Sequence, residues 1–227
     1  VDGGWFQTPG LERMAREGMT LTDFHSSGVV CSPTRAGLLT GRYQQRAGIP
    51  GVVNADPQHP DHDRFLKRDE VTFAELLRAA GYRTALFGKW HLGYDTASNP
   101  VNHGFDEFRG FVSGNIDYHS HLDRMGNADW WHGPELRQRD GYVTELITED
   151  AVRFIAANRD EPFCLYVAHG AVHAPIQAPD TGDVRGENRV PSPNGGRGRD
   201  ETVKLMMKSL LFSERSSCIC TMWPNSL

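Results

Sequence analysis

The feature that most constrains the fold is a continuous apolar run over residues 163–168, directly after Pro162. A strand that is apolar on both faces is typical of a parallel sheet covered by helices on both sides. The residues before it, 148–157, are predicted to form a helix, because their apolar side chains recur at helical spacing. This helix and strand therefore predict one unit of an α/β fold.

A second unit of the same kind lies earlier in the chain. Residues 72–75, Thr-Phe-Ala-Glu, form a capping box that predicts the start of a helix, and Gly81 ends it. Residues 83–91 follow as a predicted strand, and alternation places Lys89 and His91 on a common side if the strand stays extended. Ligand sites form at the carboxyl ends of strands in open α/β sheets, so this pair is a candidate site.

Other segments complete the expected architecture. A helix is predicted from Thr8–Pro9 to Gly18, followed by a strand over residues 19–25. Residues 117–139 are expected to form an irregular loop whose aromatic side chains either stack on a sugar ring or pin the loop to the body. The repeated order of helix, glycine, strand and polar loop predicts an α/β fold with a mostly parallel sheet flanked by helices.

Composition narrows the possible functions. The chain has 227 residues, enough for one sizeable core, and a net charge of −5, which argues against a general nucleic-acid binder. No apolar run approaches the roughly 20 residues that span a membrane, so no membrane partner is expected. The four cysteines form neither a disulfide framework nor a paired zinc motif. The chain shows no initiator Met and no signal peptide, and we expect its start to be missing.

The segment around Cys31 carries the most chemistry. Pro33 suits the start of a helix and Gly41 suits the residue after its end, so a short helix is predicted over residues 33–40. Cys31 would lie at its positive end, which favours anions and lowers the pKa of a thiol. Arg35 follows one turn later and faces the same anion. The sequence therefore predicts an anion site that contains a reactive residue.

The motif Cys31-x-Pro33-Thr34-Arg35-x-x-x-Leu39-Thr40-Gly41 resembles the signature of the type I sulfatases. In that family the motif cysteine is oxidised to formylglycine. A cysteine-phosphatase loop is excluded, because its Cys-x5-Arg spacing places Gly37 where the arginine belongs. The alternative for this motif alone is a helix N-terminus with an inert buried cysteine.

Three further blocks resemble sulfatase motifs in family order. Residues 88–93, Gly-Lys-Trp-His-Leu-Gly, resemble a second motif, and residues 102–111 resemble the segment that shapes the substrate pocket. Ser113 falls close to a serine that assists in some members. Residues 169–175 resemble the strand-end His-x-Pro element, which places His173 in the active site.

The resemblance implies the alkaline-phosphatase-like fold and covers residues 1 to about 211, roughly the first half of a member. It implies that hydrated formylglycine at position 31 attacks the sulfur of a sulfate ester and later eliminates sulfate. Arg35 would then hold the diol, Lys89 and His173 would bind sulfate oxygens, and one of these two would protonate the leaving oxygen. His91 would take the proton for the elimination step.

The family also implies a calcium ion, with Cys31, as formylglycine, among its ligands. The remaining ligands are absent from this chain: no Asp-Asp strand precedes Trp5 and no Asp-Asn pair follows His173. The family's late active-site lysine is missing as well. Residues 58–63, Gln-His-Pro-Asp-His-Asp, match no ligand spacing and are expected to form a solvated loop.

We therefore expect a sulfuric ester hydrolase that cleaves carbohydrate or aryl sulfates through formylglycine made from Cys31. The alternatives are a phosphodiester or phosphonate hydrolase of the same superfamily and a non-catalytic fragment. The expected partners are a sulfated small molecule or glycan and a formylglycine-generating maturation enzyme. The family implies a periplasmic, secreted or lysosome-like location. Residues 1–212 are expected to form a sulfatase catalytic domain truncated at both ends, and residues 213–227 an aberrant, irregular tail.

Overall fold

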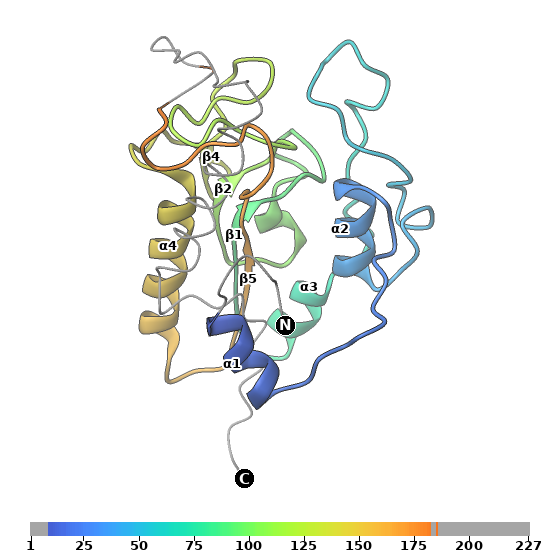
Figure 1. The fold of residues 1–227 in the computed structure, drawn as a ribbon. Helices are drawn as coiled ribbons and strands as arrows, with labels where there is room; N and C mark the ends of the chain where they lie inside the picture. The colour runs from blue at the N-terminus through green and yellow to red at the C-terminus, as the bar shows by residue number, and fades with distance from the viewer. Residues whose placement is uncertain (1–8, 183–184, 186–227) are drawn as a thin grey trace.

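The computed structural model describes residues 9–182 and residue 185, with helices on both sides of a five-stranded sheet (Figure 1). No helix in this part of the chain is long and apolar enough to cross a membrane. The elements follow in this order: α1 (Pro9–Glu17), α2 (Cys31–Thr40), α3 (Phe73–Ala79), β1 (Arg83–Lys89), the 3-10 helix η1 (Pro100–His103), β2 (Glu107–Phe111), β3 (Trp131–His132), β4 (Glu135–Leu136), α4 (Val143–Asn158) and β5 (Phe163–Ala168).

The sheet has the strand order β4-β3-β2-β1-β5. Its central strand, β1, runs parallel to β2 on one side and to β5 on the other. β3 and β4 form an antiparallel hairpin beyond β2. The longer strands are thus all parallel, which confirms the predicted α/β class. The hairpin falls inside the region predicted to be irregular, because strands of two residues are too short to show a hydrophobic period.

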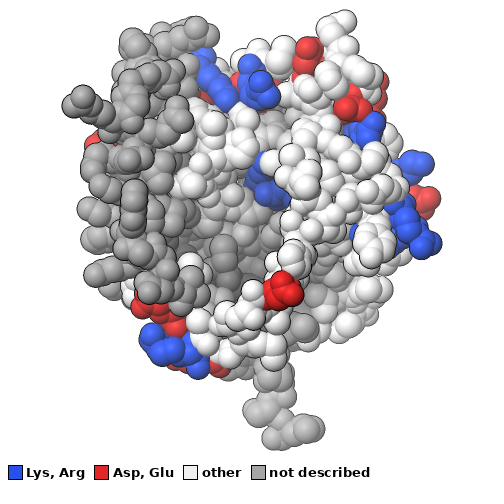
Figure 2. Space-filling view, turned by 45° about the vertical axis from the view of Figure 1, so that its right-hand side comes forward, with Lys and Arg blue, Asp and Glu red and all other residues white. Residues whose placement is uncertain are grey.

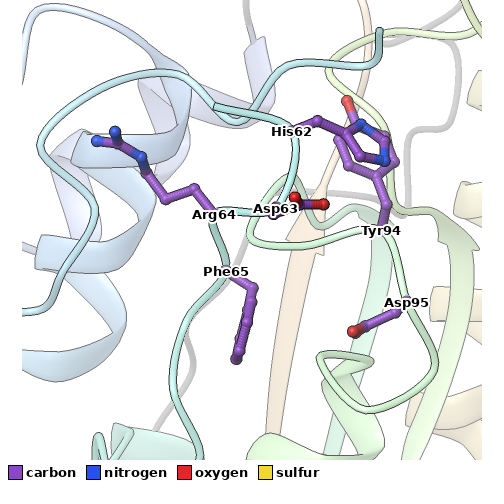
Figure 3. A pocket seen from close by; sticks show the side chains of 6 residues that line it. All are labelled: His62, Asp63, Arg64, Phe65, Tyr94 and Asp95. Atoms are coloured by element: carbon purple, nitrogen blue, oxygen red, sulfur yellow. The ribbon is translucent and has the colours of Figure 1, made fainter. Parts of the chain in front are cut away.

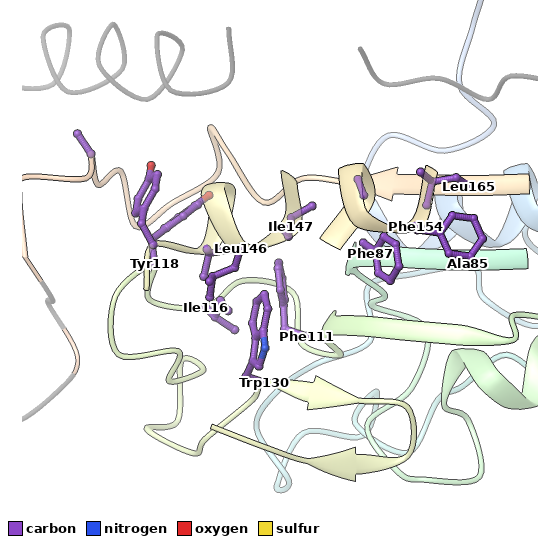
Figure 4. Packing of buried hydrophobic residues seen from close by; sticks show 14 residues of the cluster. Ala85, Phe87, Phe111, Ile116, Tyr118, Trp130, Leu146, Ile147, Phe154 and Leu165 are labelled. Carbon is purple, nitrogen blue, oxygen red and sulfur yellow. The ribbon is translucent and has the colours of Figure 1, made fainter. Parts of the chain in front are cut away.

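The two faces of β1 are buried in different hydrophobic clusters. Ala85 and Phe87 belong to the cluster that includes residues of α4, whereas Leu86 belongs to the cluster that includes residues of α2. The rings of Phe87 and Phe154 pack edge to face with centroids 5.8 Å apart (Figure 4). This burial on both faces fixes β1 in the middle of the molecule, and its carboxyl end carries Lys89.

Local signals set the helix boundaries. At the start of α3, Thr72 Oγ1 accepts the Glu75 N–H at 3.2 Å and Glu75 Oε2 accepts the Thr72 N–H at 2.8 Å, which confirms the capping box. α4 begins at Val143, ahead of the expected start at residue 148. The earlier start is favourable because Val143 and Leu146 extend the buried face of the helix.

The strand predicted over residues 19–25 was wrong. These residues form no strand, and Met19, Leu21 and Phe24 are 85%, 62% and 71% exposed. Among the described strands none lies beside this segment to accept its backbone hydrogen bonds, so its apolar pattern has no core to face. The predicted N-terminal helix does form, as α1, and no residue of α1 is buried.

Some predictions fall outside the described residues. They concern the helix over residues 201–211, most of the loop over residues 178–199 and the tail over residues 213–227. The domain boundary at residue 212 therefore stays a prediction.

Candidate active site

The site begins at the first turn of α2. The helix starts at Cys31 itself, with Val30 as an extended N-cap, so Cys31 belongs to the helix instead of preceding it. Pro33 is accordingly the third helical residue, a place in the first turn where its missing N–H costs nothing. Ser32 is fully buried and its hydroxyl accepts the Val53 N–H at 3.1 Å. The free N–H groups of this turn make the surroundings of Cys31 favourable for an anion.

Side chains from two other segments converge on Cys31: Lys89 and His91 from the end of β1, and His173 from the loop after β5. The pKa of the Cys31 thiol is lowered to about 4, chiefly through hydrogen bonding from His173, with Lys89 adding positive charge, and the His91 ring also lies within hydrogen-bond reach of the sulfur. Burial opposes this shift but does not outweigh it. The structure thus brings together the cysteine, the lysine and both histidines predicted for the site, although 142 positions separate Cys31 from His173.

Lys89 is the last residue of β1 and is only 3% exposed. Its pKa is lowered to about 8, first by burial and then by the charge of Arg35. The space-filling view shows one group of basic atoms set in a hollow among uncharged residues (Figure 2). A partly desolvated ammonium group interacts more strongly with an anion than a hydrated one does, so Lys89 is well placed to hold sulfate.

His91 reaches Cys31 by a turn of the backbone. The prediction that the strand stays extended through His91 was wrong, because β1 ends at Lys89 and His91 has a left-handed φ of 59°. Its Nε2 lies 2.9 Å from the Val53 carbonyl, which can only accept, so Nε2 must carry the proton. Burial lowers the pKa of His91 and keeps the ring neutral. Nδ1, which is buried without a hydrogen bond of ordinary geometry, is therefore left as a base.

Arg35 contacts β1 and β5, and no contact recorded among the described residues joins it to Cys31, so its role of holding the diol stays a prediction. Its Nη1 donates to the Lys89 carbonyl at 2.7 Å and lies 3.5 Å from the Tyr166 hydroxyl on β5. The guanidinium group thus ties α2 to the carboxyl ends of β1 and β5. It also places a fixed positive charge beside Lys89, and this charge contributes to the lowered pKa of that lysine.

His173 lies in the loop after β5. Its Nδ1 donates to the Ala174 carbonyl at 2.9 Å, and its pKa is raised, mainly by hydrogen bonding to Cys31. The Tyr118 hydroxyl donates to the His173 carbonyl at 3.1 Å and anchors the loop. His173 is exposed, so it can hold a proton and still meet a ligand from solvent.

Ser113 is placed differently from the other predicted residues. It is 1% exposed, and its hydroxyl donates to the Asn115 carbonyl at 2.9 Å within its own loop. The structure records no interaction between Ser113 and Cys31. The next residue, Gly114, does adjoin the site, because a methyl group there would lie 2.7 Å from Cε1 of His91. The role predicted for Ser113 stays a prediction.

The described residues do not fit a calcium ion. No group of three or more acidic, histidine or cysteine side chains among them could hold a metal. Calcium takes six to eight oxygen ligands, whereas Cys31 is surrounded by a lysine and two histidines. No step of the chemistry below is therefore assigned to a metal.

The histidine- and aspartate-rich loop has other partners. The His62 ring stacks on Tyr94 with centroids 5.1 Å apart, and its Nδ1 donates to the Asn54 carbonyl at 2.8 Å. Asp61 pairs with Arg64. Figure 3 shows His62 and Tyr94 together on the wall of a pocket of about 360 Å³, with the Arg64 side chain turned away from them. His62 and Asp61 thus have protein partners within and beside this loop.

The aromatic residues of the 117–139 region serve the core. Tyr118 and Trp130 are 2% and 3% exposed and belong to the cluster around α4. His121 is buried, and its Nε2 donates to the Gly141 carbonyl at 2.9 Å. Of the two roles left open for this region, pinning the loop is the one these side chains perform. Trp130 offers no free face to a sugar ring.

Sequence reasoning did not find every part of the site. The Val53 carbonyl fixes the tautomer of His91, and Asp129 accepts the N–H of Val112, whose carbonyl accepts the His91 N–H. Every residue has a main-chain carbonyl, so no residue pattern in the sequence could have indicated the role of the Val53 carbonyl. Asp129 had only a weak signal, a single acidic residue directly before Trp130 and Trp131.

The fold and this site define an α/β protein of the alkaline-phosphatase-like class. A family model described as Sulfatase matches residues 2–192, a range that contains every residue of the site. The chain belongs to the sulfatase family. This confirms the predicted family and fold.

Curated relatives and solved structures agree. N-acetylgalactosamine-6-sulfatase of Rattus norvegicus is 35% identical over 189 residues, which are 76% of this chain and 36% of the relative. Arylsulfatase J of Mus musculus is 32% identical over 191 residues, 78% of this chain and 30% of the relative. The chain thus spans about a third of the length of these relatives.

Two solved structures show how far the fold is shared. The crystal structure of Ps i-CgsB aligns with a TM-score of 0.73 and 27% identity, over 89% of this chain and 47% of that one. The structure of BT4656 in complex with its substrate, D-glucosamine-2-N,6-O-disulfate, aligns with a TM-score of 0.60 and 30% identity, over 78% of this chain and 32% of that one.

Proposed function

We propose that this chain carries the nucleophile side of a sulfate-ester hydrolase, with Cys31 as the position that becomes the nucleophile. The observation that carries the proposal is the convergence of Lys89, His91 and His173 on Cys31. Lys89 and His91 come from the end of β1 and His173 from the loop after β5, and together they can hold an anion, donate a proton and accept one. These are the three tasks that hydrolysis of a sulfate ester requires.

Lys89 and His173 bind the sulfate group. The ammonium of Lys89 faces developing negative charge from a partly dry position, where its attraction for that charge is strong. His173 holds a proton more firmly than an ordinary histidine, since its pKa is raised, and it is open to solvent. His173 is therefore suited to protonate the oxygen of the departing alcohol.

His91 acts as the base. Its Nε2 proton is committed to the Val53 carbonyl and its ring is neutral, so Nδ1 has a lone pair available for a proton. A base must be both deprotonated and within reach, and His91 meets both conditions. Arg35 keeps α2 and the end of β1 at a fixed separation, which holds Cys31 and Lys89 opposite the same ligand.

The site fits a modified Cys31 better than a thiol nucleophile. Formylglycine supplies an oxygen nucleophile in place of the sulfur, and the surrounding donors suit oxygen. Cys31 is only partly buried at the start of a helix, so a maturation enzyme can reach it. That enzyme and a sulfated ester are the two partners this function requires.

The substrate we favour is a sulfated sugar. N-acetylgalactosamine-6-sulfatase is named for a sulfated sugar, and BT4656 was solved with a sulfated glucosamine as its substrate. Arylsulfatase J is named for aryl sulfates, which makes an aryl sulfate a practical reporter. The buried Trp130 contributes nothing to this choice.

The test is to co-express the 227-residue chain with a formylglycine-generating enzyme and to examine position 31 by mass spectrometry. We expect an aldehyde at position 31 and turnover of 4-nitrophenyl sulfate and N-acetylgalactosamine 6-sulfate. Cys31→Ala removes both, whereas the control Cys164→Val changes neither, because Cys164 lies buried within β5.

The alternatives give different results in the same assay. Faster turnover of 4-nitrophenyl phosphate than of the matched sulfate indicates a phosphate-ester hydrolase. An unmodified thiol together with no turnover of either ester contradicts the proposal and supports a non-catalytic fragment. Calcium titration by calorimetry adds an independent measurement, because specific calcium binding counts against a non-catalytic fragment.

A further inference from the structure

A buried carboxylate, that of Asp129, holds the main chain of the loop that contacts His91. Asp129 is 4% exposed, and it pairs with no lysine or arginine in the described part of the chain. Its Oδ1 accepts the Val112 N–H at 3.0 Å and the Trp131 Nε1–H at 2.7 Å, and its Oδ2 accepts the Ser113 N–H at 2.9 Å. A buried carboxylate that has hydrogen-bond donors but no cationic partner costs free energy to desolvate, which suggests that it has a specific role.

The segment that Asp129 holds is the segment that holds His91. The Val112 carbonyl accepts the His91 N–H at 3.1 Å. Gly114 packs so closely on the imidazole that a methyl group there would meet Cε1 at 2.7 Å and Nε2 at 2.8 Å. Residues 112–114 thus set both the backbone and the ring plane of His91. The left-handed backbone of His91 would drift without such a support.

We infer that Asp129 is a positioning residue, which fixes residues 112–114 so that His91 keeps Nε2 on the Val53 carbonyl and leaves Nδ1 to Cys31. The role rests on the function proposed above for His91. Asp129 touches neither Cys31 nor the substrate; it acts through the main chain of the segment between them. Its pKa is raised to about 6 by burial, and hydrogen bonds from the Ser113 side chain, the main chain of Val112 and Ser113, and Trp131 act against that shift.

A second buried aspartate in the same loop, Asp123, has different hydrogen-bond partners from Asp129. Asp123 is 6% exposed and also accepts backbone N–H groups, from Met125 and Asn127 at 2.8 Å each. Those bonds close a turn that does not include residues 112–114. Asp123→Asn is therefore a matched control for losing a buried carboxylate in this loop.

The experiment uses the full chain with 15N-labelled histidine, and His91 is identified by the signals that His91→Gln removes. In the wild type we expect the neutral tautomer with the proton on Nε2. Asp129→Asn places an amide N–H₂ group against a main-chain N–H donor and so loosens residues 112–114. We therefore expect the His91 ring to exchange between its two neutral tautomers. In the matured enzyme we expect a fall in kcat of about 10- to 100-fold, with KM within about 2-fold. Asp123→Asn changes neither quantity.

A folded Asp129→Asn variant whose His91 nitrogen shifts equal those of the wild type overturns the inference. If Asp129→Asn does not fold, Trp131→Phe decides, because it removes one donor to the carboxylate and keeps its charge. We expect a smaller His91 change in the same direction, and unchanged shifts in this variant contradict the inference. The spectra need no turnover, so failure of the proposed function and failure of this inference are separable.

Discussion

At the scale of single residues, the site depends on how Cys31 is kept as an anion. His173, His91 and Lys89 all lie beside its thiol, and they differ in kind. His173 is exposed and has a raised pKa, His91 is buried and neutral, and Lys89 carries charge at the end of a strand. Any negatively charged group at position 31 has these same neighbours. The reactivity of the unmodified thiol therefore measures their effect before Cys31 is converted to formylglycine.

Alkylation of unmodified Cys31 tests this directly. Since the pKa of Cys31 is lowered to about 4, we expect its reaction with iodoacetamide to stay nearly constant from pH 8 down to pH 6. His173→Ala raises that pKa, so the rate at pH 6 should fall by about 10-fold. Peptide mass spectrometry separates Cys31 from the other cysteines, and His25→Ala, which changes an exposed histidine that pairs with Asp23, serves as control.

A rate that falls steeply between pH 8 and pH 6 in the wild type would show an ordinary thiol. That result would contradict the convergence of the three side chains.

The sequence was sufficient to predict which side chains form this site, because the site residues are themselves positions of the recognised motifs. It was not sufficient to predict how the residues are held. The tautomer of His91 depends on the carbonyl of Val53, and any residue at position 53 supplies a carbonyl. The guanidinium of Arg35 likewise bonds to the backbone of Lys89, a contact that no residue pattern encodes.

At the scale of elements, β1 and β5 could be predicted because the apolar residues of each strand indicate burial on both of its faces. A run that is apolar on both faces can belong only to a strand with cover on both sides. The segment over residues 19–25 is also partly apolar, yet its apolar side chains are exposed. An apolar pattern indicates that a strand could be buried, but it does not show whether a neighbouring strand is there to pair with it. The β3–β4 hairpin is set by pairing with β2, which is a tertiary contact.

The attachment of α4 to the sheet gives a prediction at this scale. Asp150 on α4 is 2% exposed and lies 3.4 Å from Arg109 on β2 and 3.0 Å from Arg139. Asp150→Asn removes the negative charge between these arginines, so we expect the free energy of unfolding in urea to fall by about 2 kcal/mol. Asp160→Asn, an exposed partner of Arg159, should change it by less than about 0.5 kcal/mol.

Equal stability of Asp150→Asn and Asp160→Asn would mean that the carboxylate does not hold α4. The slope of the urea transition should be unchanged in both variants, because neither alters the surface exposed on unfolding.

At the scale of the whole molecule, the parallel sheet explains why distant residues meet. Parallel strands end at one edge, so Lys89 at the end of β1 and His173 after β5 must lie on the same side of the sheet. This much follows from the α/β class. What the class leaves open is the interior polar network, in which buried histidines such as His103 and His121 are kept neutral by the fold.

These histidines make the folded molecule sensitive to acid. Burial lowers the pKa of His103 to about 4, while the unfolded chain has an ordinary histidine pKa of about 6.5. Between these values the unfolded state binds the extra proton, so stability is present above about pH 6.5 and is lost as the pH falls toward 4. His103 alone, which is fully buried, should account for about 2 kcal/mol between pH 7.5 and pH 5.

Urea unfolding at these two pH values measures the loss. His103→Phe keeps a ring against Trp90 but cannot bind the proton, so it should lose less stability than the wild type over the same interval. His25→Phe, at an exposed position, should behave like the wild type. Asp129 opposes the trend, because its pKa is raised to about 6 and the folded state binds its proton first. If His103→Phe keeps the full wild-type dependence, His103 is not held neutral by burial.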